Sequence, residues 1–194
     1  MKLMMAQSAY NNIEKEVLAH YPLETGGIHV GRRVYGYLVV PFTIGSGDKP
    51  ERSPTLFSPD FVTQQEMLDR LYKEYSVNYM GEFHLHPMKL SRLSGIDKLA
   101  IHRIMTNPDY NIEEAIFTVV NIEKESVVLH PYYATRDDTD LIEIRYEVIP
   151  DDDPLIKYTL GIPKVIKRKE KEEVKPKLEK RILKGKSEKC ALIS

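Results

Sequence analysis

The sequence predicts an α/β protein, a three-layer sandwich in which helices flank one mixed β-sheet. Two observations carry this prediction. Apolar residues make up 42% of the 194 residues, and 12 Tyr and 5 Phe add bulk for a core. Segments with helical spacing also alternate with short apolar segments typical of strands, in the order helix, two strands, helix, strand, helix and three strands. Helices interleaved with strands in this way pack on the faces of a sheet.

The first part of the chain is predicted to contain two helices and two strands. Apolar residues at helical spacing indicate a helix that begins near Ser8 and ends before Pro22, because the residue before a proline resists the helical conformation. Segment 44–58 is rich in Gly, Pro and Ser, which predicts a loop. The predicted elements are a helix over 8–20, strands near 26–31 and 34–43 joined tightly around residues 31–33, and a helix that opens at 58–60.

The second part of the chain is predicted to contain four strands and one helix, and then to lose its pattern. The elements are a strand over 77–86, a loop over 87–93, a helix from 94 to about 106, and strands over 114–121, 125–133 and 140–149. After residues 151–154 the pattern dissolves, and from Lys164 on the chain is charge-rich with few aromatic residues. We therefore expect one domain over residues 1–150, followed by a linker and a charged, disordered tail over 151–194.

Charge is unevenly distributed along the chain. The net charge is -1, but residues 164–189 hold 12 Lys or Arg against five Glu, so the remainder is acidic. An acidic body argues against nucleic acid as the substrate, because phosphate binding needs a basic face. We interpret the basic segment as a solvated tail, with contact to RNA, a membrane or an acidic protein as the alternatives.

Cysteine content and hydropathy indicate where the protein acts. Cys190 is the single cysteine, which excludes an internal disulfide and every Cys-rich zinc site. No apolar run approaches the roughly 18 residues that span a bilayer. We expect a cytoplasmic protein that acts on neither nucleic acid nor a membrane.

The segment GEFHLHP, residues 81–87, carries the strongest indication of chemistry. Because side chains alternate along a strand, His84 and His86 point to the same face. Asp97 lies one turn into the next predicted helix and can turn back as a third ligand. Two imidazoles and one carboxylate leave a fourth position for water, as in catalytic zinc sites. The alternatives are two histidines with ordinary hydrogen bonds, and a Ser94-x-x-Asp97 pair that only caps a helix.

These residues, once assembled, resemble a known family. The pattern His84-x-His86-Pro87, six further residues and Ser94-x-x-Asp97 resembles the signature of the JAMM (JAB/MPN) zinc metalloproteases. The upstream segment PLETGG, which contains Glu24, is similar to the glutamate segment of that family. The resemblance covers about residues 1–135 and is closest to the prokaryotic branch. It implies the JAB/MPN fold, which is like that of cytidine deaminases.

The resemblance also implies an activity. Members of the family cleave isopeptide or peptide bonds after the C-terminus of ubiquitin or a ubiquitin-like protein, in deconjugation or precursor processing. By this similarity His84, His86 and Asp97 would bind Zn²⁺, Glu24 would be the general acid and base, and Ser94 would stabilise the oxyanion. The implied partners are a ubiquitin-like protein or its conjugates, and E1-like and E2-like proteins of the same pathway.

Three alternatives remain open at this stage. Without the family resemblance, the preferred interpretation of Glu24 is an ordinary loop carboxylate. The protein can also be an inactive MPN scaffold, although such relatives typically lack the glutamate or a ligand, and this chain keeps all five residues. The third alternative is that the protein is a metallopeptidase that acts on small sulfur-carrier adducts.

Overall fold

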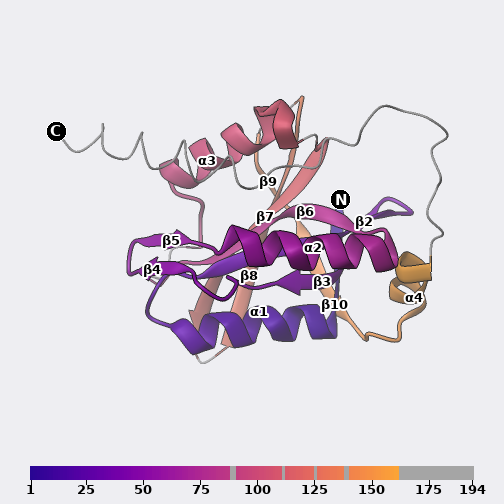
Figure 1. Ribbon diagram of the computed structural model, residues 1–194, viewed down its shortest axis with the longest axis horizontal. Helices are drawn as coiled ribbons and strands as arrows, with labels where there is room; N and C mark the ends of the chain where they lie inside the picture. Colours follow the sequence, from indigo (N-terminus) through magenta and orange to yellow (C-terminus); the bar gives the residue numbers. More distant parts are fainter. Residues whose placement is uncertain (88–90, 111, 125, 138–139, 162–194) are drawn as a thin grey trace.

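The computed structural model describes residues 1–87, 91–110, 112–124, 126–137 and 140–161 (Figure 1). The helices are α1 (Gln7–His20), α2 (Phe61–Tyr75), α3 (Gly95–Thr106) and α4 (Pro154–Gly161), with a short 3-10 helix at Pro108–Tyr110. The strands are β1 (Lys2–Ala6), β2 (Gly26–Val34), β3 (Tyr37–Ile44), β4 (Glu51–Ser53), β5 (Leu56–Ser58), β6 (Asn78–Leu85), β7 (Glu114–Glu123), β8 (Ser126–Thr135), β9 (Ile142–Glu143) and β10 (Arg145–Ile149).

The main sheet is mixed and strongly curved. Its eight strands follow the order β10-β1-β3-β2-β6-β7-β8-β9, and β4 and β5 form a separate hairpin. The sheet curls until it nearly closes into a barrel, so the predicted flat three-layer sandwich is wrong, although the α/β class and the mixed sheet are correct.

Helix α1 explains the curl. The Thr43 hydroxyl on β3 donates to the Ala9 carbonyl oxygen (2.9 Å), and the Tyr10 hydroxyl donates to the Val127 carbonyl oxygen on β8 (2.8 Å). Three strands separate β3 from β8 in the sheet order. In a flat sheet those two strands would stand about 19 Å apart, at roughly 4.8 Å per spacing. Neighbouring residues of one helix can reach both strands only because the sheet bends around the helix.

The two faces of the sheet have different cores. Ala9, Ile13 and Val17 bury one side of α1 against the inner face, which holds the largest apolar cluster. Helices α2 and α3 pack on the outer face, where α2 covers Ile28 of β2 and α3 covers the middle of β7. None of the helices within the described ranges is long and apolar enough to cross a bilayer.

Three predicted boundaries differ from the structure. The β2–β3 turn lies at Tyr35 and Gly36, both with positive φ, and residues 31–33 instead belong to β2, which carries a bulge there. Part of the predicted loop 44–58 forms the β4–β5 hairpin. The predicted strand 140–149 is divided into β9 and β10.

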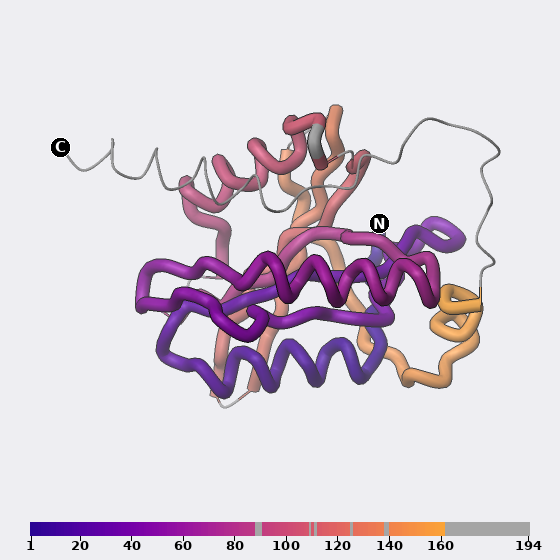
Figure 2. The backbone as a smooth tube through the Cα atoms, in the orientation of Figure 1, coloured from indigo at the N-terminus to yellow at the C-terminus, as the bar shows by residue number. Residues whose placement is uncertain are grey.

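Two elements at the ends of the domain were not predicted. Strand β1 lies between β10 and β3, pairs in parallel with both, and buries Leu3 and Met5 completely. The tube in Figure 2 passes from β1 straight into α1. Helix α4 packs on β3 beyond the expected domain limit of residue 150, with Ile156 and Thr159 buried. Of the linker and tail expected over residues 151–194, residues 154–161 form α4, and residues 162–194 lie outside the described residues.

His29 is a fully buried histidine on the inner face of β2. Its Nε2 is 2.9 Å from the Thr118 hydroxyl, and its ring stands 5.6 Å from that of Phe83. Burial lowers the pKa of His29 from 6.5 to about 3. The unfolded chain therefore binds a proton at a pH where the folded protein does not, and the free energy of unfolding falls as the pH decreases from 6.5 toward 3.

We expect this histidine to cause acid destabilisation. Between pH 7 and pH 5 its contribution is about 2 kcal/mol, because one pKa unit corresponds to about 1.4 kcal/mol. Urea unfolding of the wild type and His29→Gln at both pH values measures it. The wild type should lose about 2 kcal/mol more than the variant, and equal losses in both proteins would contradict the prediction.

Candidate metal centre

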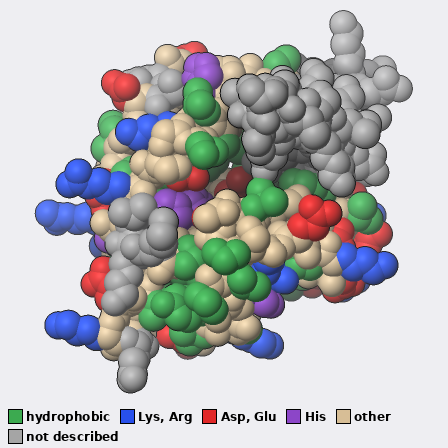
Figure 3. Space-filling view, turned by 90° about the vertical axis from the view of Figure 1, so that its left-hand side faces the viewer, with side chains coloured by type: hydrophobic (Ala, Val, Ile, Leu, Met, Phe, Trp, Pro, Cys, Tyr) green, Lys and Arg blue, Asp and Glu red, His purple; other side chains and the backbone are tan. Residues whose placement is uncertain are grey.

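Strand β6 brings the two histidines together, as predicted. Phe83 and Leu85 point to the inner core, so His84 and the next alternate residue, His86, point to the outer face. Their Nε2 atoms are 2.7 Å apart. Both side chains are mostly buried, with 24% of His84 and 10% of His86 exposed. Figure 3, which shows the left-hand side of the molecule in Figure 1, has histidine at the surface near the middle of the view, with hydrophobic side chains above and below it.

Asp97 completes the triad from the first turn of α3. One carboxylate oxygen, Oδ1, is 3.5 Å from His84 Nε2, and the other, Oδ2, is 3.4 Å from His86 Nε2. The Ser94 backbone N–H donates to Oδ2 (2.7 Å), and the Asp97 N–H donates to the Ser94 hydroxyl (3.2 Å). This capping box confirms the helix-capping interpretation and also orients the carboxylate toward the histidines. The two interpretations of Asp97 therefore coexist in one geometry.

The triad has dimensions that suit a small divalent cation. One ligand atom from each residue lies within 4.8 Å of the others. Tetrahedral coordination with bonds of 2.0–2.1 Å places ligand atoms about 3.3 Å apart. Each His-to-Asp separation is close to this length, but the two run to different carboxylate oxygens, and the His-to-His separation of 2.7 Å is shorter. Small shifts of the side chains are therefore needed for one Asp97 oxygen and both imidazoles to share an ion. The arrangement does not distinguish zinc from other small divalent ions.

Electrostatics keep the triad in the protonation state that metals bind. Burial lowers the pKa of His84 from 6.5 to about 4, and the charges of Asp97 and Glu82 offset only part of this effect. Burial raises the pKa of Asp97, but the hydrogen bond with His86, the charge of His84 and the bonds with Ser94 outweigh it and leave the pKa below its ordinary value. At neutral pH the site therefore offers an unprotonated imidazole and a carboxylate.

Glu24 reaches the site through the register of β2 and β6. Gly26 pairs with His84 in this antiparallel ladder, and the Leu85 N–H donates to the Thr25 carbonyl oxygen (2.8 Å). Continuing the register by one more residue sets Glu24 opposite His86. Directly opposed residues share a face of the sheet, so Glu24 belongs to the face that carries the triad. On the other side, the Glu24 N–H donates to the Ser53 carbonyl oxygen of β4 (2.9 Å).

Gly26 and Gly27 permit this close pairing. A Cβ atom at Gly26 would meet the Phe83 carbonyl oxygen at 2.2 Å, and one at Gly27 would meet the Ile44 carbonyl oxygen at 2.0 Å. Any larger residue would therefore displace β6 or β3 from β2. The glycine pair lets both neighbouring strands approach next to the glutamate segment.

Ser94 lies at the surface beside the triad. Its hydroxyl oxygen accepts the Asp97 N–H, so the hydroxyl hydrogen points elsewhere and can serve as a donor. The structure thus brings His84, His86 and Asp97 together, and Ser94 caps the helix that carries Asp97. The Glu24 backbone lies next to this group, because Thr25, the following residue, is bonded to Leu85 of β6.

The structure adds Asn121, which the sequence did not single out. The His86 N–H donates to the Val120 carbonyl oxygen (2.9 Å), so the parallel register sets Asn121 beside His86 on the outer face of β7. Its side chain is fully buried, and neither amide atom has a hydrogen-bond partner among the described residues. The preceding positions on this face, Ala115, Phe117 and Val119, are apolar. In the sequence, the only indication of this residue is a polar amide that follows three apolar residues at alternate positions near the end of the predicted strand.

Comparison with known proteins identifies only the fold. No model of a protein family and no curated protein matches the chain. Among solved structures, it is similar to the solution structure of a structural-genomics protein from Desulfitobacterium hafniense, with 18% sequence identity and a TM-score of 0.58. The match covers 76% of this chain and 93% of the other. The fold and site together define an α/β protein with a curled mixed sheet and a possible His-His-Asp metal triad.

We expect the triad to bind one divalent ion per chain. His84→Ala with His86→Ala should remove two of three ligands and weaken zinc binding by more than about 100-fold, since even an outer-shell change costs 10- to 100-fold. Metal analysis and zinc titration measure this, and His102→Ala, an exposed histidine on α3, is the control. Stoichiometric zinc in the double variant would contradict the assignment.

Proposed function

We propose that the protein is a zinc-dependent isopeptidase of the JAMM type, which cleaves after the C-terminus of ubiquitin or a ubiquitin-like protein. The observation that supports this most directly is the triad of His84, His86 and Asp97, beside which the Glu24 backbone segment is bonded. The β2–β6 register and the capping box of α3 produce this arrangement. The resemblance of the sequence to the family supplies the reaction and the class of substrate.

The donor set suits zinc. Two imidazoles and one carboxylate are the ligands of several catalytic zinc sites, which keep one position open. When bound, zinc would supply Lewis acidity that activates water and polarises a carbonyl group.

In this proposal Glu24 transfers the proton and Ser94 stabilises the oxyanion. The Glu24 carboxylate takes a proton from the attacking water and returns it to the leaving amine, as a general base and then a general acid. The Ser94 hydroxyl donates to the oxygen of the scissile carbonyl as negative charge develops there. The Asp97 carboxylate keeps one orientation, because both of its oxygens are already engaged.

We expect Glu24→Gln to lower kcat by about 10²- to 10⁴-fold while zinc content and fold persist, because a proton carrier is lost and no ligand is removed. Steady-state cleavage of a ubiquitin-like protein fused to a C-terminal reporter measures kcat, and metal analysis measures zinc. Glu66→Gln, an exposed change on α2, should have no effect. A kcat near that of the wild type in Glu24→Gln would refute the proposed role.

The shape of the substrate follows from the position of the triad. A carbonyl has to come within about 3 Å of the nucleophile, which a flexible extended tail can do more easily than a folded surface. Both edges of β6 are paired, one with β2 and the other with β7, so the tail would lie across the outer face at the end of β6 and would not add to this strand. The β4–β5 hairpin would lie next to the tail, because β4 is bonded to the Glu24 segment. Residues 88–90 of the predicted loop over 87–93 lie outside the described residues.

We expect cleavage to depend on small residues before the scissile bond. Reporter fusions in which the last glycines are replaced by leucine should show a lower kcat/KM, since the bulk would meet the ligands. Equal cleavage of all fusions, or cleavage only of short peptides without the ubiquitin-like body, would favour a peptidase that acts on small adducts.

A further inference from the structure

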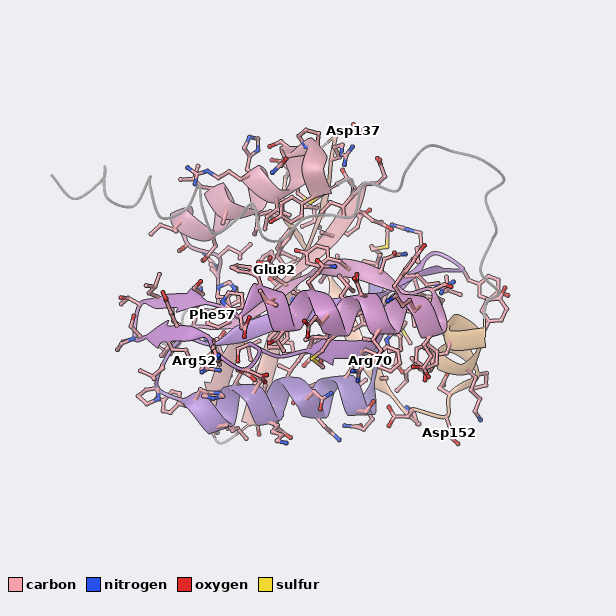
Figure 4. All side chains as sticks on the ribbon, viewed as in Figure 1. Arg52, Phe57, Arg70, Glu82, Asp137 and Asp152 are labelled. Carbon is pink, nitrogen blue, oxygen red and sulfur yellow. The ribbon has the colours of Figure 1, made fainter. Side chains whose placement is uncertain are left out.

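A buried polar cluster lies behind Glu24, on the inner side of the sheet. The Arg52 guanidinium on β4 donates through Nε to the Thr25 hydroxyl (3.1 Å) and through Nη2 to the Glu16 carboxylate on α1 (3.1 Å). It also donates to the Ser46 hydroxyl, and the Thr25 hydroxyl donates to Glu16. Figure 4 shows Arg52 between the β4 strand and α1. We define these four residues, Glu16, Thr25, Ser46 and Arg52, as the Arg52 cluster.

The cluster is well shielded and charged. Only 15% of the Arg52 side chain and 14% of the Glu16 side chain are exposed. Burial raises the pKa of Glu16, but hydrogen bonds from Thr25, Ser46 and Arg52 and the charge of His20 outweigh it, so the pKa lies below its ordinary value. Buried ion pairs contribute little net stability compared with apolar residues of similar size. Stability alone is therefore a weak reason for this cluster, and fixing a geometry is a better one.

The geometry that the cluster fixes is that of the Glu24 backbone. The Glu24 N–H donates to the carbonyl oxygen of Ser53, which follows Arg52 in the chain. Thr25 follows Glu24 and forms two bonds: its hydroxyl accepts from Arg52, and its carbonyl oxygen accepts from the Leu85 N–H of β6. Strand β3 ends at Ile44, so β4 replaces it as the neighbour of this segment. Strands β4 and β5 have three residues each and pair only with each other in the sheet pattern. Such a short hairpin is marginal by itself and needs an anchor.

We propose that Arg52 is the positioning residue for Glu24: it ties the β4–β5 hairpin to Thr25 and Glu16 and so sets the Glu24 backbone beside the metal triad. As a statement about catalysis this inference rests on the proposed isopeptidase function. Arg52 does not touch the reacting atoms. It acts on the rate through the hydrogen bond between Glu24 and Ser53, and its planar guanidinium can bond several acceptors at once, which a lysine ammonium cannot do in the same fixed geometry.

The first experiment measures the geometry without activity. Amide hydrogen exchange by NMR reports the protection of the Glu24 N–H, which is bonded to Ser53 in the wild type. In Arg52→Ala this protection should fall at least tenfold, and in Thr25→Val it should fall less. Arg33→Ala is the matched control, because Arg33 pairs with Glu114 at the far end of β2. Unchanged Glu24 protection in Arg52→Ala would overturn the proposal whatever the enzyme does.

The second experiment measures the rate. With the reporter fusion, Arg52→Ala should lower kcat at least tenfold, with KM within threefold of the wild type and one zinc per chain. The kcat of Arg52→Lys should lie between those of Arg52→Ala and the wild type, and the kcat of Arg33→Ala should equal that of the wild type. A kcat for Arg52→Ala within twofold of the wild type, or a change confined to KM, would refute the positioning role.

The outcomes separate the two proposals. A wild-type protein that binds zinc but cleaves no fusion contradicts the isopeptidase function, while the exchange experiment still decides whether Arg52 holds Glu24. An active wild type with an unaffected Arg52→Ala variant contradicts only the inference. If Arg52→Ala does not fold, Thr25→Val and Arg52→Lys carry both measurements, since each keeps part of the cluster.

Discussion

The pairing of β2 with β6 is the constraint on which the site depends. Opposed residues of an antiparallel ladder share a face of the sheet. One register, in which Gly26 pairs with His84, therefore places His84 and His86 on the same face, and its continuation assigns Glu24 to that face as well. A slip by one residue would turn the histidines toward the inner core and the apolar Phe83 and Leu85 outward. The burial of those two side chains therefore also holds the chemistry in place. Gly26 and Gly27 make the pairing possible because neither presents a Cβ atom to its neighbours.

Burial favours a neutral group on the outer face of the sheet and encloses a charged pair on the inner face. On the outer face it lowers the pKa of His84, so the imidazole is unprotonated and ready to bind a cation. On the inner face the Arg52 cluster carries a full ion pair behind Thr25. A charge in such a position costs free energy unless its hydrogen bonds are complete, and here the guanidinium meets three acceptors. Alternation along β6 separates the two environments: His84 and His86 point outward, whereas Leu85, which is bonded to Thr25, points to the inner core.

The site could be predicted further than the fold because its chemistry is local. Alternation places His84 and His86 together, and a capping box is a pattern of four residues, so both follow from short-range rules. The place of Glu24 is set by a ladder between distant segments, and only the family resemblance indicated it. The curl of the sheet also depends on distant contacts, namely those of α1 with β3 and β8. Strand β1 was missed because its five residues run into α1 without a turn, and α4 because its eight residues follow an acidic break.

The two acidic residues of the site are held in different ways, and the difference suits their proposed roles. Both Asp97 oxygens are engaged, one near His84 and the other near His86 and the Ser94 N–H, so the carboxylate has one orientation. A metal ligand needs such a fixed position. Glu24 is anchored through its backbone, between Ser53 and the β6 strand, and has one more methylene group than an aspartate. In the proposed reaction a proton moves from the attacking water to the leaving amine, two places that a single rigid carboxylate would serve poorly. A fixed backbone with a longer side chain meets that requirement.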